Sequence, residues 1–110
     1  CMKLPVNLIN KSHIAQLVRC SASSGANYRA ACRAKSKADF INKLRIVEEE
    51  LDESMFFYEL LAEFNHEFKS ELRVLYKEAN ELLSIIIVSI NTSLKNIEAD
   101  KQKAVKNLKS

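Results

Sequence analysis

Acidic residues are the side chains in this sequence that most resemble a chemical site. One short run contains Glu48, Glu49, Glu50, Asp52 and Glu53. Paired carboxylates can bind a metal ion or exchange protons in acid–base catalysis. On a helix, however, Glu48 with Asp52 and Glu49 with Glu53 are like-charge pairs at contact spacing, which is mildly destabilising. We therefore expect a basic helix, rather than a metal ion, to lie beside this run.

A second pattern that could bind a metal is the spacing of Glu63 and His66. The Glu-x-x-His motif supplies ligands in di-iron helical bundles, but such a site needs two copies of the motif and further inward-facing Glu residues. This sequence has one copy, at the end of a predicted helix, where a histidine also interacts favourably with the helix dipole. The sequence therefore predicts no metal ligands and no cofactor.

Nucleophilic catalysis is weakly supported by the two internal cysteines, Cys20 and Cys32. Neither has a histidine at a supportive spacing, because His13 falls at a helix start and His66 at a helix end. Buried thiols are common and unreactive, so packing is the favoured role for both cysteines. Because no nucleophile, base and orienting group occur together, we expect no catalytic residues, no small-molecule substrate and no enzyme activity.

Basic residues form a second candidate site. Arg29 and Arg33 are four residues apart and so lie about 40° apart on a helix, Lys35 and Lys37 follow, and Arg19 precedes them. One interpretation is a basic strip that contacts nucleic-acid phosphates without reading bases. The other, which we favour, is that Arg29 and Arg33 pair with the acidic run, across helices or across subunits. Aromatic residues are not interleaved with these bases, so stacking on single-stranded bases is not supported.

Charge is segregated along the chain, although the whole carries a formal net charge of only +3. Residues 1–45 carry nine Lys or Arg and one acid, residues 46–67 carry eight acids and no base, and residues 68–110 carry eight bases and five acids. This segregation predicts that neighbouring helices or neighbouring subunits match opposite charges.

The three cysteines are odd in number and show no disulfide spacing, which favours a reducing, cytoplasmic setting. The longest apolar run, Leu82–Ile90, is about half the length that a membrane span requires, so we expect no membrane partner. The chain begins Cys1-Met2 rather than with Met. From this we expect that residues before Cys1 are missing.

One Gly and one Pro leave little turn chemistry, so long helices in a single domain over residues 1–110 are favoured. The apolar periodicity predicts helices over about residues 12–33, 36–64 and 70–100, with Ser12, Ser36 and Ser70 as N-caps. The first helix has a stripe of small residues around Gly25. Because glycine costs about 1 kcal/mol inside a helix, we expect another helix to approach it closely.

Two of the predicted helices are apolar on more than one face. A helix of this kind is sandwiched between partners, and in a short chain we expect the second partner to be another subunit. Asn27 lies off the main stripe and either fixes register across an oligomer contact or is solvated. The candidate oligomer interface therefore contains Asn27, Ile46, Phe57, Leu60, Phe64, Val74, Ile85 and Val88.

The stretches Gln16–Arg19, Ser23–Ala31, Arg33–Ser36, Asp39–Ile41 and Leu44–Glu53 carry a family resemblance. In these stretches the chain resembles the bacterial four-helix-bundle family of proteins encoded in intervening sequences of 23S ribosomal RNA, which includes the accessory protein of diversity-generating retroelements. The likeness spans about nine-tenths of the chain, and its motifs are structural rather than catalytic.

Two departures from the family pattern occur. Many members read Asn-Ile-Ala-Glu-Gly where this chain has Asn27–Ala31. Members also carry a helix before the one that starts near Ser12, and Cys1–Leu4 is its only candidate remnant here. The resemblance thus implies an all-α, antiparallel up-down four-helix bundle that lacks its first helix in this chain.

The resemblance also implies a homo-oligomeric ring, a pentamer in the better-known members, whereas the basic retroelement relatives bind a reverse transcriptase and nucleic acid. Our leading hypothesis is a non-enzymatic helical module that self-associates as a ring. The alternative is an accessory protein that binds RNA, DNA or a reverse transcriptase. Its candidate binding residues are Arg19, Arg29, Arg33, Lys35 and Lys37.

Overall fold

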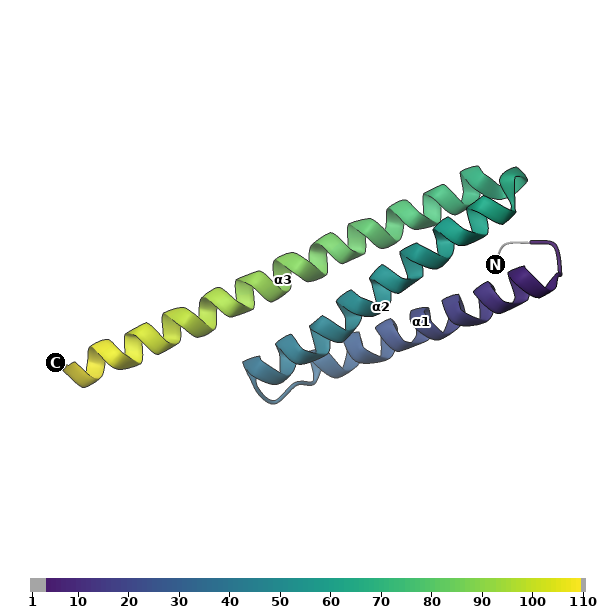
Figure 1. Ribbon diagram of the computed structural model, residues 1–110. Coiled ribbons are helices and arrows are strands. Elements are labelled where there is room, and N and C mark those ends of the chain that lie inside the picture. The colour runs from purple at the N-terminus through teal and green to yellow at the C-terminus, as the bar shows by residue number, and fades with distance from the viewer. Residues whose placement is uncertain (1–3, 110) are drawn as a thin grey trace.

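The computed structural model describes residues 4–109 of the chain. Its elements are α1 (Leu8–Cys32), α2 (Lys37–Phe64), a 3-10 turn η1 (His66–Phe68) and α3 (Lys69–Lys109), as Figure 1 shows. No strand occurs among the described residues, so the prediction of an all-helical protein is confirmed. Most of Cys1–Leu4, the candidate remnant of an earlier helix, lies outside the described residues.

The ends of the helices follow from local capping chemistry. Before α1, the side chain of Asn7 accepts a hydrogen bond of 2.8 Å from the backbone N–H of Asn10, so α1 begins earlier than the predicted cap at Ser12. Ser36 does cap α2, with Oγ accepting from the N–H of Asp39 at 3.1 Å. Ser70 is not a cap, because η1 leads directly into α3 and leaves Ser70 inside that helix.

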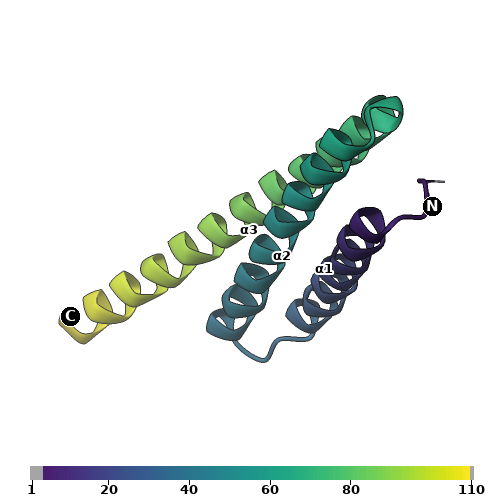
Figure 2. The same ribbon diagram turned by 45° about the vertical axis from the view of Figure 1, so that its right-hand side comes forward.

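The three helices run antiparallel to their chain neighbours, with α2 in the middle (Figures 1 and 2). α2 packs against α1 on one side and against α3 on the other, whereas α1 and α3 make no contact with each other in the described chain. The arrangement is therefore an open, three-helix up-down-up layer. The fourth helix of the predicted bundle is not among residues 4–109.

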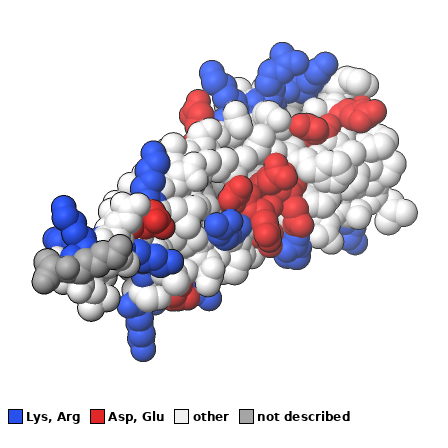
Figure 3. All heavy atoms as spheres, turned by 60° about the vertical axis from the view of Figure 1, so that its left-hand side comes forward, with Lys and Arg blue, Asp and Glu red and all other residues white. Residues whose placement is uncertain are grey.

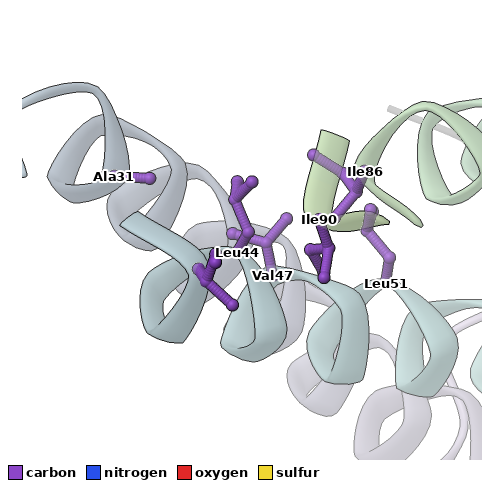
Figure 4. Packing of buried hydrophobic residues seen from close by; sticks show 7 residues of the cluster. Ala31, Leu44, Val47, Leu51, Ile86 and Ile90 are labelled. Carbon is purple, nitrogen blue, oxygen red and sulfur yellow. The ribbon is translucent and has the colours of Figure 1, made fainter. Parts of the chain in front are cut away.

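The main hydrophobic core lies where α2 packs against its neighbours (Figure 4). Leu44, Val47 and Leu51 of α2 are buried together with Ile86 and Ile90 of α3. Their spacing of three and four residues places them on one face of each helix. Ala31 of α1 joins the same cluster, so the core holds all three helices together.

A buried pair of amides joins the start of α1 to the end of α2. Asn10 donates to Oδ1 of Asn65 at 2.8 Å, and Asn65 donates back to Oδ1 of Asn10 at 2.7 Å. Each amide nitrogen also donates to a backbone carbonyl at 2.9 Å, that of Pro5 for Asn10 and that of Leu61 for Asn65. Because both side chains are buried, these bonds satisfy groups that water cannot reach.

The second apolar face of α2 contacts α1 of the same chain. The imidazole of His13 lies 6.1 Å from the ring of Phe57 and 6.0 Å from the ring of Phe64, measured between ring centroids. The partner expected from another subunit is thus supplied at this point by α1. Phe64 nevertheless remains half exposed, and Ile46 and Leu60 are partly buried.

α3 extends past the end of the layer. The Nζ of Lys37, at the first position of α2, pairs with a carboxylate oxygen of Asp100 at 2.5 Å. Beyond that ion pair α3 continues to Lys109 and residues 101–108 are exposed, whereas the sequence predicted a helix that ends near residue 100. Figure 1 shows this yellow segment projecting alone.

One stretch of α3 is strongly apolar. The stretch His66–Leu108 contains an 18-residue window of mean hydropathy 1.2, which is long and apolar enough to cross a membrane, and 11% of that window is buried. A single helix of this kind is weak evidence for a membrane span, because core helices of soluble proteins can meet the same criterion. The finding shows that much apolar surface of α3 is uncovered in a single chain.

Candidate functional site

The most prominent concave feature is an apolar groove between α1 and α3, with α2 as its floor. One hollow of about 580 Å³ lies near the start of α1, and a second of about 440 Å³ lies further along. We call the two together the open groove. Its side chains from the two rims include Leu17, Val18, Gly25, Tyr28, Leu82 and Ile85.

The rims of the open groove expose large apolar side chains. Val18 of α1 is 62% exposed and Ile85 of α3 is 60% exposed. The floor residues Val47 and Leu51 are buried in the core beneath them. The groove therefore has an apolar lining and a base held rigidly by the core.

Gly25 faces this groove without a close neighbour. A Cβ atom placed on Gly25 would have no heavy atom within 4 Å, apart from its own helix backbone and chain neighbours. The close approach that we expected at this stripe of small residues is therefore not made by α2 or α3. The glycine has room because the rim opposite it, α3, does not touch α1.

The acidic run of α2 meets a basic residue of α1, as expected, but that residue is Arg19. Its Nη1 lies 3.4 Å from a carboxylate oxygen of Glu50, and its Nη2 lies 2.5 Å from one of Glu53. The predicted pairing of Arg29 and Arg33 with this run is not made between the helices of the described chain, and pairing across subunits stays a prediction. Both residues are exposed, and no ion pair within the described chain includes them.

Cys20 belongs to the same cluster. Its buried thiol donates to a carboxylate oxygen of Glu53 at 3.1 Å. Burial, followed by the hydrogen bond to Glu53, raises the pKa of Cys20 to about 12. The same hydrogen bond, together with the one from Arg19, lowers the pKa of Glu53 below its usual value. Cys20 is therefore held as a thiol at neutral pH.

The ligand atoms of Cys20, Glu50 and Glu53 lie within 4.8 Å of one another, a spacing that could hold a metal ion. The guanidinium of Arg19 already pairs with both carboxylates, and a protonated thiol is a poor ligand. The arrangement therefore suits a structural contact between α1 and α2. Glu63 and His66 are exposed and do not join any such cluster in residues 4–109.

The basic candidates divide into two groups. Arg19 and Lys37 are held in ion pairs, whereas Arg29, Arg33 and Lys35 are exposed at the end of α1 and the following turn, with no ion pair in the described residues. The Lys37–Asp100 ion pair brings the lysine-rich end of α3 towards this turn. Sequence separation hid this contact between Lys37 and Asp100, which are 63 positions apart.

The remaining interface candidates lie in different places. The side chain of Asn27 donates to the backbone carbonyl of Ser23 at 2.9 Å, within α1. Val74, Ile85 and Val88 are exposed on α3, and Ile85 lines the open groove. Figure 3 shows a cluster of acidic side chains near the middle of the visible face, with basic side chains beside it and along the edges of the molecule.

The fold, three long helices in an open layer with an apolar groove, is that of a small all-helical protein. No family model matches the chain, and a search of curated proteins gives no significant match. One solved structure is similar: a protein with unknown function from the S23 ribosomal protein family of Bacteroides thetaiotaomicron VPI-5482. The two share 33% sequence identity with a TM-score of 0.68, over 71% of this chain and 72% of the other.

The chain therefore belongs to the S23 ribosomal protein family. This membership is consistent with the resemblance to proteins of ribosomal RNA intervening sequences. The similar structure is itself a protein of unknown function, so the comparison supports the fold and the family and leaves the role to physical argument.

Proposed function

We propose that this protein is a non-enzymatic, cytoplasmic helical module that self-associates as a homo-oligomeric ring. The observation that carries the proposal is the open groove between α1 and α3. In a four-helix up-down bundle a further helix fills that position and buries its apolar lining. We propose that a second copy of the chain supplies that cover.

Two features support an apolar cover. Large side chains on both rims are more than half exposed, among them Val18, Tyr28 and Leu82. Contiguous apolar surface of this kind marks interaction sites on soluble proteins. Gly25 and its small neighbours leave room for a helix backbone to come close, which compensates for a glycine inside α1.

Light scattering coupled to size-exclusion chromatography tests the proposal. The wild-type chain is expected to elute with the mass of several copies. Val18→Glu places a charge on an exposed rim position and is expected to leave each chain folded while the mass falls to one copy. Val6→Glu is the matched control, since Val6 is 97% exposed and does not line the groove. A wild-type monomer at high concentration would overturn the proposal.

A second candidate function, binding of RNA, DNA or a nucleic-acid enzyme such as a reverse transcriptase, rests on the unpaired basic residues. Arg29, Arg33 and Lys35 lie exposed at one end of the layer, towards which the lysines of α3 also extend. Exposed cations can neutralise phosphates and release counterions without reading sequence. This surface is separate from the open groove, so both functions can be tested independently.

A mobility-shift titration in a salt series tests this candidate. Replacing Arg29, Arg33 and Lys35 by Gln is expected to weaken binding and to reduce the slope of log K against log salt by about two to three. The control replaces Arg45, Arg73 and Lys77, which removes the same charge elsewhere on the exposed surface. Equal losses from both triple variants would indicate non-specific attraction, and no shift at low salt would exclude the function.

A further inference from the structure

One exposed face of α3 has a regular pattern that the single chain does not use. Leu72, Ala79, Ile86 and Ile90 turn towards α2 and are buried. A different set recurs at alternating steps of four and three residues, the spacing of a coiled-coil seam, and all of its members are exposed. We call this set the α3 seam: Glu71, Val74, Glu78, Glu81, Ile85, Val88, Thr92, Lys95, Ala99, Gln102 and Lys106.

Charge is ordered along the α3 seam. Its first part carries Glu71, Glu78 and Glu81, and its last part carries Lys95 and Lys106. Between the two parts lie the apolar side chains Ile85 and Val88, which are 60% and 62% exposed. No ion pair within the described chain uses any of these charges. A surface that is acidic at one end, apolar in the middle and basic at the other complements itself when reversed.

We propose that a second copy of this chain lies along the α3 seam, with its own α3 running antiparallel about a twofold axis between Ile85 and Val88. The inference rests on the proposed self-association and adds a second contact beside the open groove, with which it shares Ile85. The seam from Glu71 to Lys106 spans about 53 Å at 1.5 Å per residue, so the pair of helices is long. An isologous contact of this kind joins copies in pairs, and within a ring assembly it joins two rings.

The register follows from the symmetry. With Ile85 facing Val88 of the partner subunit, each seam position faces another seam position. Glu78 then faces Lys95 of the partner subunit, and Glu81 faces the neutral Thr92 of the partner subunit. Val74 faces Ala99 of the partner subunit, and Lys106 faces Glu67 of the partner subunit, the acidic residue of η1 one step before the seam begins. In this register no like charges face each other, and the apolar residues meet at the centre.

The order of the charges favours a second copy over a lipid surface. A membrane would cover the apolar middle of the seam but would desolvate Glu78, Glu81 and Lys95 without a partner, which is costly. A nucleic-acid backbone along the seam would place its negative phosphates against the negative carboxylates of the first half, which repel them. A reversed copy satisfies both halves at once, with opposite charges placed to set the register.

Reversing the charges of Glu78 and Lys95 by substitution tests the antiparallel pairing of the two α3 helices. Each single variant, Glu78→Lys or Lys95→Glu, creates like-charge contacts twice per pair of chains and is expected to weaken pairing about tenfold. The double variant in one chain is expected to restore it, because every contact regains opposite charges. The control is Lys101→Glu, which reverses a charge about 120° around α3 from Lys95.

Mixing the two single variants is the decisive measurement, read by native mass spectrometry of differently labelled chains. Glu78→Lys chains are expected to pair with Lys95→Glu chains in preference to themselves. Assembly that persists unchanged in all variants would overturn the α3 pairing and leave the proposed self-association intact. A wild-type monomer that binds lipid vesicles would overturn both, and an assembly with an odd number of chains would overturn the twofold contact alone.

Discussion

Arg19 shows how far the sequence could predict the ion-pair partner of a single residue. The sequence indicated that the acidic run on α2 needs a basic partner, and the structure supplies one from α1. Within the chain that partner is Arg19 instead of Arg29 or Arg33, because the choice depends on which side of α1 turns towards α2. The neighbouring Cys20 is completely buried, which brings Arg19 to the edge of the contact and leaves Arg29 and Arg33 facing solvent.

The charge of Glu53 is expected to stabilise the folded protein in a pH-dependent way. The hydrogen bond from Cys20 and the one from Arg19 lower its pKa below the ordinary value of 4.5. The unfolded chain therefore binds this proton more readily, so the stabilisation is present above that value and is lost as the pH falls through the lowered pKa. Glu53→Gln should lower the melting temperature at pH 7, and the difference from wild type should vanish in acid.

Thermal unfolding at pH 7 and at steps down to pH 3 measures this effect. Glu63→Gln is the control, because Glu63 is an exposed carboxylate of the same helix and no ion pair within residues 4–109 includes it. A melting-temperature difference for Glu53→Gln that stays constant across the series would show that the charge of Glu53 is not what the contact with Arg19 and Cys20 stabilises.

At the scale of the helices, periodicity predicted three long helices, and the stripe of Leu44, Val47 and Leu51 is buried as expected. The first residue of each helix was harder to predict. A serine that could cap a helix does not show whether the chain before it is already helical. The buried pair of Asn10 and Asn65 was not predicted at all. Its two members are 55 positions apart, and neither has a local pattern that signals a partner.

The amide pair is expected to hold α1 against the end of α2. Asn10→Leu leaves Oδ1 of Asn65 without its donor in a buried place, and we expect it to lower the free energy of unfolding by about 1–3 kcal/mol. The double variant with Leu at both positions should recover part of this loss, because two apolar side chains can pack without unmet hydrogen bonds.

Chemical denaturation of the single and double variants measures the amide contribution. Asn80→Leu serves as the control, since Asn80 is exposed on α3 and is expected to change stability little. Losses that simply add in the double variant would contradict a direct interaction between the two amides.

At the scale of the whole molecule, the chain is elongated, with extents of 68 × 21 × 16 Å. The all-helical class followed from composition and period. The sequence did not show how much of each helix a single chain leaves uncovered. An apolar face has the same sequence pattern whether a neighbouring helix or another molecule covers it. The open groove at Gly25 is the clearest example.

Gly25→Ala is expected to act with opposite signs on the chain and on its assembly. In the single chain the new methyl group meets open space, so helix propensity should raise the free energy of unfolding by about 0.5–1 kcal/mol. In the assembly the methyl group should obstruct the covering helix and weaken association. Denaturation at low concentration and sedimentation over a concentration series measure the two effects, and tighter association of the variant would contradict a close approach at Gly25.

The absence of any contact between α1 and α3 in the described chain gives the molecule two separate joints. The amides of Asn10 and Asn65 pin α1 to α2 at one end, and the Lys37–Asp100 ion pair pins α3 to α2 at the other. Each outer helix is therefore fastened to α2 at its own end of the layer. The width of the open groove is consequently set by these two contacts with the middle helix and not by any bond between the outer helices of the described chain.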